Sequence, residues 1–249
     1  MRPFFSWFGS KWNAVDKGLY PSPEYRTLVE PFAGSACYAL HFHWLDVRLY
    51  DLDPVICGIW DYLISASESE IMSLPLLEPG QRIDEVGPLV QEARWLIGLC
   101  INVASTQPKH QMTAWGSEKN FNRNCAVWGA ARRWRIASQV DSIRHWRVEN
   151  CSYSEIPDLE ATWFVDPPYQ DKGKWYVHGS SGIDYPHLGG WCAERKGEAI
   201  VCEQSGADWL PFRFAGEVFS SQYSESGERS KSSEVVWTTS RPRQIRLPW

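Results

Sequence analysis

Short apolar runs recur along the chain, and polar or turn-forming residues separate them. Continuous apolar runs of this length are typical of strands buried on both faces of a parallel sheet. A helical pattern over residues 54–65 follows the second run, and further helical stretches lie between later runs. This alternation predicts an α/β fold with helices on both faces of the sheet. The predicted strands are Thr27–Glu30, Val47–Tyr50, Trp163–Val165, Ala199–Cys202 and Val235–Thr238, with a weaker one near Arg147–Glu149.

The segment Ser220–Ser233 is rich in Ser, Glu and Gly, and it is predicted to be a loop. With 43% apolar and 22% charged residues, the composition is that of an ordinary globular chain. A length of 249 residues accommodates one large domain, or one domain that carries a sizeable insert.

The sequence also favours one compartment. It has no apolar run of 18 residues, so no membrane span is expected. The N-terminus lacks the apolar stretch and small-residue cleavage site of a signal peptide. The seven cysteines are odd in number and include no C-x-x-C pair, which disfavours a disulfide framework and a zinc site. We therefore expect a cytoplasmic protein that binds no metal.

Charge is distributed unevenly. The net charge of −5 excludes a protein that is basic throughout, but it leaves room for a local basic face. Residues 61–92 hold seven acids and one base, whereas residues 94–147 hold nine bases and two acids. The basic segment is interleaved with Trp115, Trp128, Trp134 and Trp146. Cations and flat rings suit a nucleic-acid surface, although a solvated helical face would give a similar pattern.

Two early motifs fit a nucleoside site. Glu30–Ala36 (Glu-Pro-Phe-Ala-Gly-Ser-Ala) follows a predicted strand, and its tiny residues can expose backbone N–H groups at the start of a helix. It lacks G-x-G-x-x-G, so an ordinary tight turn is an equally good interpretation. Asp51 lies 21 residues after Glu30, close to the spacing of an acid that binds ribose hydroxyls. Asp53 suits a helix N-cap better, and Pro54 would begin that helix.

The most specific motif is Asp166-Pro167-Pro168-Tyr169. It follows a predicted buried strand, at the end where parallel sheets bind ligands. The two prolines stiffen the turn and remove two N–H donors, which leaves the carbonyl groups and the Asp oxygens as acceptors. Such an array fits the exocyclic amino group of a planar heterocycle, and the Tyr ring supplies a face for stacking. Hydrogen bonds from both N–H groups would localise the nitrogen lone pair for attack on a methyl group.

Four places along the chain, in order, resemble the Dam-type DNA adenine-N6 methyltransferases, a family associated with phages and restriction–modification systems. Phe5–Lys11 resembles the family's opening F-x-K-W-x-G-G-K run. Glu30–Ala36 resembles its glycine motif for S-adenosyl-L-methionine (AdoMet), Asp51 its ribose-binding acid, and Asp166–Tyr169 its catalytic D-P-P-Y. The resemblance covers most of the chain outside residues 57–146. It implies an enzyme of a bacterial or phage-infected cytosol.

The resemblance also implies a domain layout and a reaction. Residues 1–56 and 147–249 would form a catalytic domain with a Rossmann-like, AdoMet-dependent methyltransferase sheet. Residues 57–146 would form an inserted, mostly helical target-recognition domain. The enzyme would flip an adenine out of double-stranded DNA and transfer the AdoMet methyl group directly to its N6 atom. It would act as a monomer or weak dimer, without a metal.

Individual residues take roles from the resemblance. Asp166 and the Pro167 carbonyl would accept from the adenine amino group, and Tyr169 would stack on the flipped base. The predicted catalytic residues are Asp166, Pro167, Pro168 and Tyr169. The predicted AdoMet contacts are Trp7, Lys11, Glu30, Phe32, Gly34, Asp51 and Asp166. The predicted DNA contacts are Lys119, Arg123, Arg132, Arg133 and Arg135 in the basic segment, with Arg229 and Lys231 near the C-terminus.

Departures from the family pattern keep other functions open. Ser35 and Ala36 stand where family members often carry glycines, and Asn150-Cys151-Ser152 stands where an acid near the AdoMet adenine is expected. A non-catalytic DNA-binding module on a methyltransferase scaffold is one alternative. Others are a cytosine-N4 enzyme, which usually carries Ser in place of Asp166, an RNA adenine methyltransferase and a small-molecule N-methyltransferase.

Overall fold

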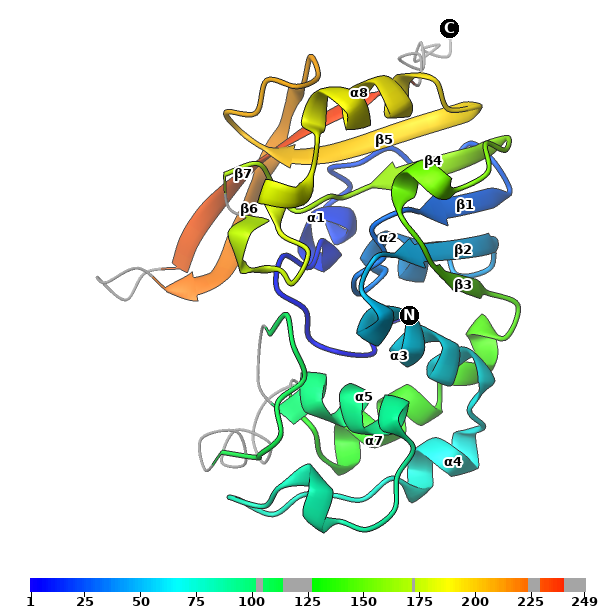
Figure 1. The fold of residues 1–249 in the computed structure, drawn as a ribbon, viewed down its shortest axis with the longest axis vertical. Helices are drawn as coiled ribbons and strands as arrows, with labels where there is room; N and C mark the ends of the chain where they lie inside the picture. Colours follow the sequence, from blue (N-terminus) through cyan, green and yellow to red (C-terminus); the bar gives the residue numbers. More distant parts are fainter. Residues whose placement is uncertain (102–104, 114–126, 172, 224–228, 240–249) are drawn as a thin grey trace, which may run out of the picture.

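The computed structural model describes residues 1–101, 105–113, 127–171, 173–223 and 229–239. Within these ranges the chain folds around one seven-stranded sheet with helices packed on it (Figure 1). Two of the predicted DNA contacts, Lys119 and Arg123, lie outside the described residues, as does Trp115.

The sheet has the strand order β3-β2-β1-β4-β5-β7-β6. The first five strands in this order are parallel, whereas β7 is antiparallel to both β5 and β6. The predicted α/β class is confirmed, and the mostly parallel sheet is compatible with a Rossmann-like fold. The chain reverses its direction of winding between β1 and β4, and ligands of open α/β sheets bind at such a switch point. The strands are β1 (Thr27–Glu30), β2 (Asp46–Asp51), β3 (Arg147–Asn150), β4 (Ala161–Val165), β5 (Gly197–Gln204), β6 (Arg213–Tyr223) and β7 (Arg229–Thr238).

Successive residues of the central strands point into two cores, as the period of two in a strand requires. Leu28 of β1 and Phe164 of β4 belong to the larger core. Val29 and Val165 belong to the other core, together with Trp191. The helices are α1 (Trp12–Asp16), α2 (Cys37–His41), α3 (Pro54–Ser65), α4 (Glu68–Ser73), α5 (Gln91–Ile101), α7 (Ala130–Ala137) and α8 (Tyr185–Ala193). The 3-10 helices are η1 (Ile83–Glu85), η2 (Val140–Ile143), η3 (Tyr153–Glu155), η4 (Gly173–Trp175) and η5 (Ser180–Gly182).

The segment between β2 and β3 is largely helical in its described part, and Figure 1 places it beside the β3 edge of the sheet. Trp60 of α3, Leu99 of α5 and Ile136 of α7 lie in the same core as strands β1 and β2. The predicted domain boundary between residues 56 and 57 falls inside α3. The segment thus shares its apolar interior with the sheet. Among the described helices, none has the length and apolar character needed to cross a membrane.

All six predicted strands are present, most with one to six additional residues. Strand β6 was not predicted, and the prediction of a loop over Ser220–Ser233 is wrong at both ends. Strand β6 reaches Tyr223 and β7 begins at Arg229, so the sheet covers most of the expected loop. These residues pair mainly through backbone groups, and backbone pairing leaves little trace in a sequence pattern.

Candidate active site

A cavity of about 360 Å³ opens at the carboxyl ends of β1, β2 and β4, at the switch point of the sheet. Its walls come from the N-terminal segment, the turn after β1, the end of β2, the segment after β3 and the loop after β4. All seven predicted AdoMet contacts line this one cavity. They are Trp7, Lys11, Glu30, Phe32, Gly34, Asp51 and Asp166.

The turn after β1 is built for a close approach of backbone and side chains. Gly34 has a φ of +43°, and a Cβ atom added to it would lie 2.8 Å from the Trp7 indole nitrogen. The Gly34 carbonyl accepts a hydrogen bond of 2.8 Å from the Trp60 indole N–H. Only glycine fits this position without strain and without displacing Trp7. Trp7 is thereby held against the turn as one wall of the cavity.

Helix α2 starts without a side-chain cap of its own. Its N-cap residue, Ala36, has a left-handed φ of +45°. Glu30, at the end of β1, lies beside this helix and accepts a hydrogen bond of 2.6 Å from the Ala39 N–H. Burial raises the pKa of Glu30 well above its ordinary value, and the Ala39 hydrogen bond opposes this effect only in part.

Asp51 joins the end of β2 to the turn after β1. Its Oδ2 atom accepts a hydrogen bond of 3.0 Å from the Gly34 N–H, and its Oδ1 atom accepts one of 2.9 Å from the Asp53 N–H. Burial raises its pKa to about 6, against the effect of these two hydrogen bonds. Each carboxylate oxygen has a second acceptor site, so Asp51 can still receive hydrogen bonds from a ligand.

The neighbouring residues stabilise this corner. Asp53 is the N-cap of α3 and accepts a hydrogen bond of 2.9 Å from the Val55 N–H, which confirms the predicted cap. Asn150, at the end of β3, donates to the carbonyl groups of Asp51 and Leu52. Asn150 therefore supports the end of β2, and Cys151, Ser152 and Tyr153 line the cavity where an acid was expected.

Asp166 begins the turn after β4 and pairs with Lys11, with 3.0 Å between Nζ and Oδ1. Lys11 is buried, and its Nζ atom also donates to the Gly9 carbonyl at 2.9 Å. Burial raises the pKa of Asp166 to about 6, and the Lys11 charge opposes this shift. Burial lowers the pKa of Lys11, but Asp166 and Glu234 more than offset it, so the pKa is raised and Lys11 stays charged.

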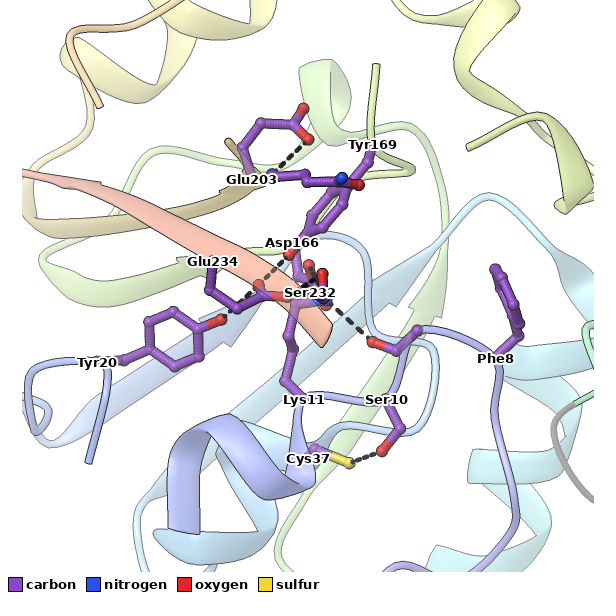
Figure 2. A network of polar contacts seen from close by, with 12 residues as sticks. Phe8, Ser10, Lys11, Tyr20, Cys37, Asp166, Tyr169, Glu203, Ser232 and Glu234 are labelled. Carbon is purple, nitrogen blue, oxygen red and sulfur yellow. Dashed lines mark hydrogen bonds and ion pairs between the residues drawn. The ribbon is translucent and has the colours of Figure 1, made fainter. Parts of the chain in front are cut away.

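The rest of the Asp-Pro-Pro-Tyr turn is fixed on several sides (Figure 2). The Pro168 carbonyl accepts a hydrogen bond of 2.6 Å from the Tyr185 hydroxyl. The Tyr169 hydroxyl donates to Glu234 at 2.6 Å, and Lys11 Nζ lies 4.4 Å from the centre of the Tyr169 ring. The next residue, Gln170, donates its N–H to the buried carboxyl group of Glu203 at 3.2 Å.

The loop after β4 lines the cavity together with the N-terminal segment. The Tyr176 hydroxyl donates to the Phe8 carbonyl at 3.0 Å, and its ring lies 6.1 Å from that of Trp7. Gly9 has a φ of +75°, and a Cβ atom there would lie 2.2 Å from the Tyr176 hydroxyl oxygen. In the sequence, Gly9 next to Phe8 could have indicated a tight turn against an aromatic ring. Nothing in the sequence, however, identifies Tyr176 as the residue that Gly9 contacts.

Most described arginines of the basic segment have structural contacts. Arg132 is 3% exposed and donates from Nε to the Phe4 carbonyl at 3.1 Å. Because its side chain is buried, the prediction that it contacts DNA is wrong. Arg133 donates to the Leu74 carbonyl, while Arg135 is half-buried. Arg94 and Arg144 likewise donate to backbone carbonyl groups of the helical segment.

The tryptophans of this segment divide in the same way. Trp128 and Trp146 are buried and donate their indole N–H groups to the carbonyl groups of Pro75 and His43. Trp134 of α7 is 61% exposed. The expectation of a local basic and aromatic face is therefore not supported by the described residues. Most described arginine side chains of this segment instead donate hydrogen bonds to backbone carbonyl groups.

The two later basic residues lie on strands. Arg229 begins β7 and pairs with Tyr223 of β6. Lys231 is exposed and forms an ion pair of 2.9 Å with Glu217. A phosphate contact by Lys231 would therefore compete with this neighbouring carboxylate.

Within the described ranges, no group of three or more His, Cys, Asp or Glu side chains is arranged to hold a metal ion. A comparison of the sequence with protein-family models and with curated proteins found no match. The function therefore has to be argued from the fold and from the chemistry of the cavity.

Proposed function

We propose that the protein is a DNA methyltransferase that transfers the methyl group of AdoMet to the N6 amino group of adenine. The observation that carries this proposal is the convergence of three distant segments on one cavity. The turn after β1, the end of β2 and the Asp166–Tyr169 turn, which contributes Asp166 and Pro168 to the lining, meet at the switch point of a mostly parallel sheet. Parallel sheets bind nucleotides and related ligands there.

The cavity suits AdoMet in charge and shape. The carboxyl groups of Glu30, Asp51 and Asp166 are among those that line it, and burial raises the pKa of each of these three. A cationic ligand would relieve their desolvation, and AdoMet carries a sulfonium and an ammonium group. Asp51 would receive the ribose hydroxyls through its remaining acceptor sites, with Trp7 and Phe32 as apolar walls. When bound, AdoMet would supply an electrophilic methyl group.

The Asp166–Tyr169 turn suits an amino group on a flat ring. Asp166 would accept one N–H through its carboxylate. The Pro168 carbonyl is already engaged by Tyr185, whereas the Pro167 carbonyl accepts no hydrogen bond from the described part of the chain. The Pro167 carbonyl would therefore accept the other N–H. Two such hydrogen bonds orient the amino group and make its nitrogen lone pair more available for direct transfer, without a covalent intermediate with the protein.

Double-stranded DNA as the partner rests mainly on the resemblance of this turn to the adenine-N6 enzymes. Extruding a base from the duplex costs about a few kcal/mol, which binding of the surrounding strands would have to offset. The exposed Trp134 and the half-buried Arg135 of α7 are the described residues of the basic segment that suit such a surface best.

The direct test is to incubate the protein with isotopically labelled AdoMet and mixed-sequence duplex DNA. The DNA is then digested to nucleosides, which are analysed by mass spectrometry. Label in N6-methyldeoxyadenosine would support the proposal. Label in N4-methylcytosine would keep the reaction and overturn the acceptor, while transfer to RNA alone would overturn the DNA substrate.

A non-catalytic DNA-binding module is a second candidate, because two features of the cavity are unusual. Both oxygens of Asp51 already accept backbone hydrogen bonds, and Ala36 holds a left-handed conformation that favours glycine. Calorimetry with AdoMet separates the two candidates. An enzyme should bind AdoMet and lose methyl transfer in Asp166→Ala while it keeps DNA binding. A binding module should bind DNA without measurable affinity for AdoMet.

A further inference from the structure

Glu234 of β7 is a buried carboxyl group beside the Asp166–Tyr169 turn, and the AdoMet and acceptor contacts argued above do not use it. It is 3% exposed. Burying a carboxylate is costly unless it is well hydrogen-bonded. In Figure 2, Glu234 contacts the side chains of Tyr20 and Tyr169, so its burial has to be explained together with theirs.

Three hydroxyl groups donate to this carboxylate. Its Oε2 atom accepts from the Tyr169 hydroxyl at 2.6 Å and from the Tyr20 hydroxyl at 3.1 Å. Its Oε1 atom accepts from the Ser232 hydroxyl at 3.2 Å. The shortest contact joins Glu234 to the ring that would stack on the acceptor base. Hydrogen bonds to a charged acceptor are about twice as strong as those between neutral groups.

Lys11 completes the arrangement. Its Nζ atom pairs with Asp166 at 3.0 Å, lies over the Tyr169 ring, and interacts electrostatically with Glu234. The ammonium group thus pairs with the carboxylate of the turn and also interacts electrostatically with the carboxylate on β7. Both ends of the turn, Asp166 and Tyr169, are connected to Glu234 in this way.

We propose that Glu234 is a positioning residue for the Asp166–Tyr169 turn, which it holds through the Tyr169 hydroxyl so that the stacking ring is fixed before the acceptor base enters. This inference rests on the proposed function. The inference adds a structural element to the proposed site, because the antiparallel strand β7 contributes to it as well as the parallel strands. Fixing the ring in advance would lower the cost of ordering it in the complex.

The test compares Glu234→Gln, which keeps the shape and removes the charge, with Tyr169→Phe, which keeps the ring and removes the hydroxyl. Each should lower kcat roughly ten-fold with little change in the affinity for AdoMet. The double variant should be about as active as either single variant, because both changes break one connection. Additive losses would overturn the proposal.

Two further variants serve as controls. Tyr20→Phe removes a hydroxyl from the same Glu234 oxygen without touching the turn. Glu198→Gln removes a buried carboxylate near the start of β5, where it accepts from the Thr162 hydroxyl at 2.9 Å. Both should keep nearly full activity. If either lowers kcat as much as Glu234→Gln does, the effect is general destabilisation and the proposal fails.

A second readout does not require activity. The negative charge of Glu234 raises the pKa of Asp166, so Glu234→Gln should lower it and Glu198→Gln should not. NMR of the labelled Asp166 carboxyl carbon, assigned with Asp166→Asn, measures this shift. An unchanged Asp166 pKa would overturn the proposal. The other titratable groups around Asp166 are Lys11, Tyr20, Glu30, Tyr169, Tyr176, Cys202 and Glu203.

The two readouts also separate this inference from the proposed function. If wild-type protein transfers no methyl group but the Asp166 pKa shifts in Glu234→Gln, the proposed function fails and the contact survives as a structural one. If wild-type protein is active and Glu234→Gln is equally active, the proposed function stands and the positioning role is wrong.

Discussion

At the scale of single residues, the site depends on carboxyl groups that the fold withdraws from water. Asp166 has both a charged partner, Lys11, and a pKa of about 6, because burial outweighs the ion pair. A carboxyl group in this state changes its charge within an experimentally convenient pH range. Its ionisation therefore offers a direct test of its role.

We predict that methyl transfer is lost in acid as Asp166 takes up a proton. A protonated carboxyl group is a poorer acceptor for the amino group, so kcat/KM should fall about ten-fold per pH unit below about pH 6. Steady-state kinetics between pH 5 and 8, in a buffer of constant ionic strength, would measure this. If kcat/KM fell only near pH 4, where an ordinary Asp takes up a proton, the prediction would be wrong.

We also predict that Gly34→Ala weakens AdoMet binding. The added methyl group would meet the Trp7 indole at 2.8 Å and would sit on a left-handed backbone, at a cost of about 1–3 kcal/mol. Gly80→Ala is the matched control, because Gly80 has a φ of +82° with no atom within 4 Å of the added carbon. Calorimetry should show lower AdoMet affinity in Gly34→Ala, and equal affinities in both variants would refute the role of this contact.

Single-residue roles were the hardest feature to predict in the basic segment. Arg132 follows two alanines and precedes two further cations within four residues, which resembles a surface helix. It is buried because the helix packs against the N-terminal segment and the Phe4 carbonyl needs a donor. The acids of the cavity, Glu30, Asp51 and Asp166, were predictable, since their place at strand ends follows from the order of the elements.

At the scale of elements, the helix and strand ends that form the site can be recognised from nearby residues in the sequence. Asp53 and Pro54 mark the start of α3, and the strand before them delivers Asp51 to the cavity. Glu30 and Asp166 likewise follow apolar runs that the sequence displays plainly. Strand β6 lacks such a signal because it pairs at the sheet edge with β7 and leaves Phe214 and Phe219 exposed.

We predict that Asp53→Ala destabilises the protein by about 1 kcal/mol, through the loss of the α3 cap. Asp53→Asn should retain most of the stability, because Asn is an equally good N-cap. Urea unfolding followed by circular dichroism would compare the two variants with wild type. Equal stability of Asp53→Ala and Asp53→Asn would show that the cap is not what matters at this position.

At the scale of the whole molecule, the buried carboxyl groups couple the free energy of unfolding to pH. The pKa of Asp51 is about 6 in the folded protein and about 4 in an unfolded chain. The Asp51 carboxyl group therefore binds a proton more tightly in the folded protein than in the unfolded chain. The contribution of Asp51 to stability is largest below pH 4 and declines as the pH rises to 6.

We predict that this decline disappears in Asp51→Asn. The difference in free energy of unfolding between wild type and the variant should fall by up to about 3 kcal/mol from pH 4 to pH 6, and then level off. Urea titrations at several pH values would give this difference. A difference that grows with pH would mean that the folded protein favours the ionised form of Asp51.

The order of segments in the site also has a consequence for how the protein is made. Lys11 leaves the ribosome well before Asp166, and Glu234 follows in β7, the last of the described strands in chain order. Strand β4 inserts beside β1, and β7 inserts between β5 and β6, so these contacts join residues far apart in the chain. Such contacts form slowly. A growing chain would thus have a hydrated lysine and no assembled site until β7 has been synthesised.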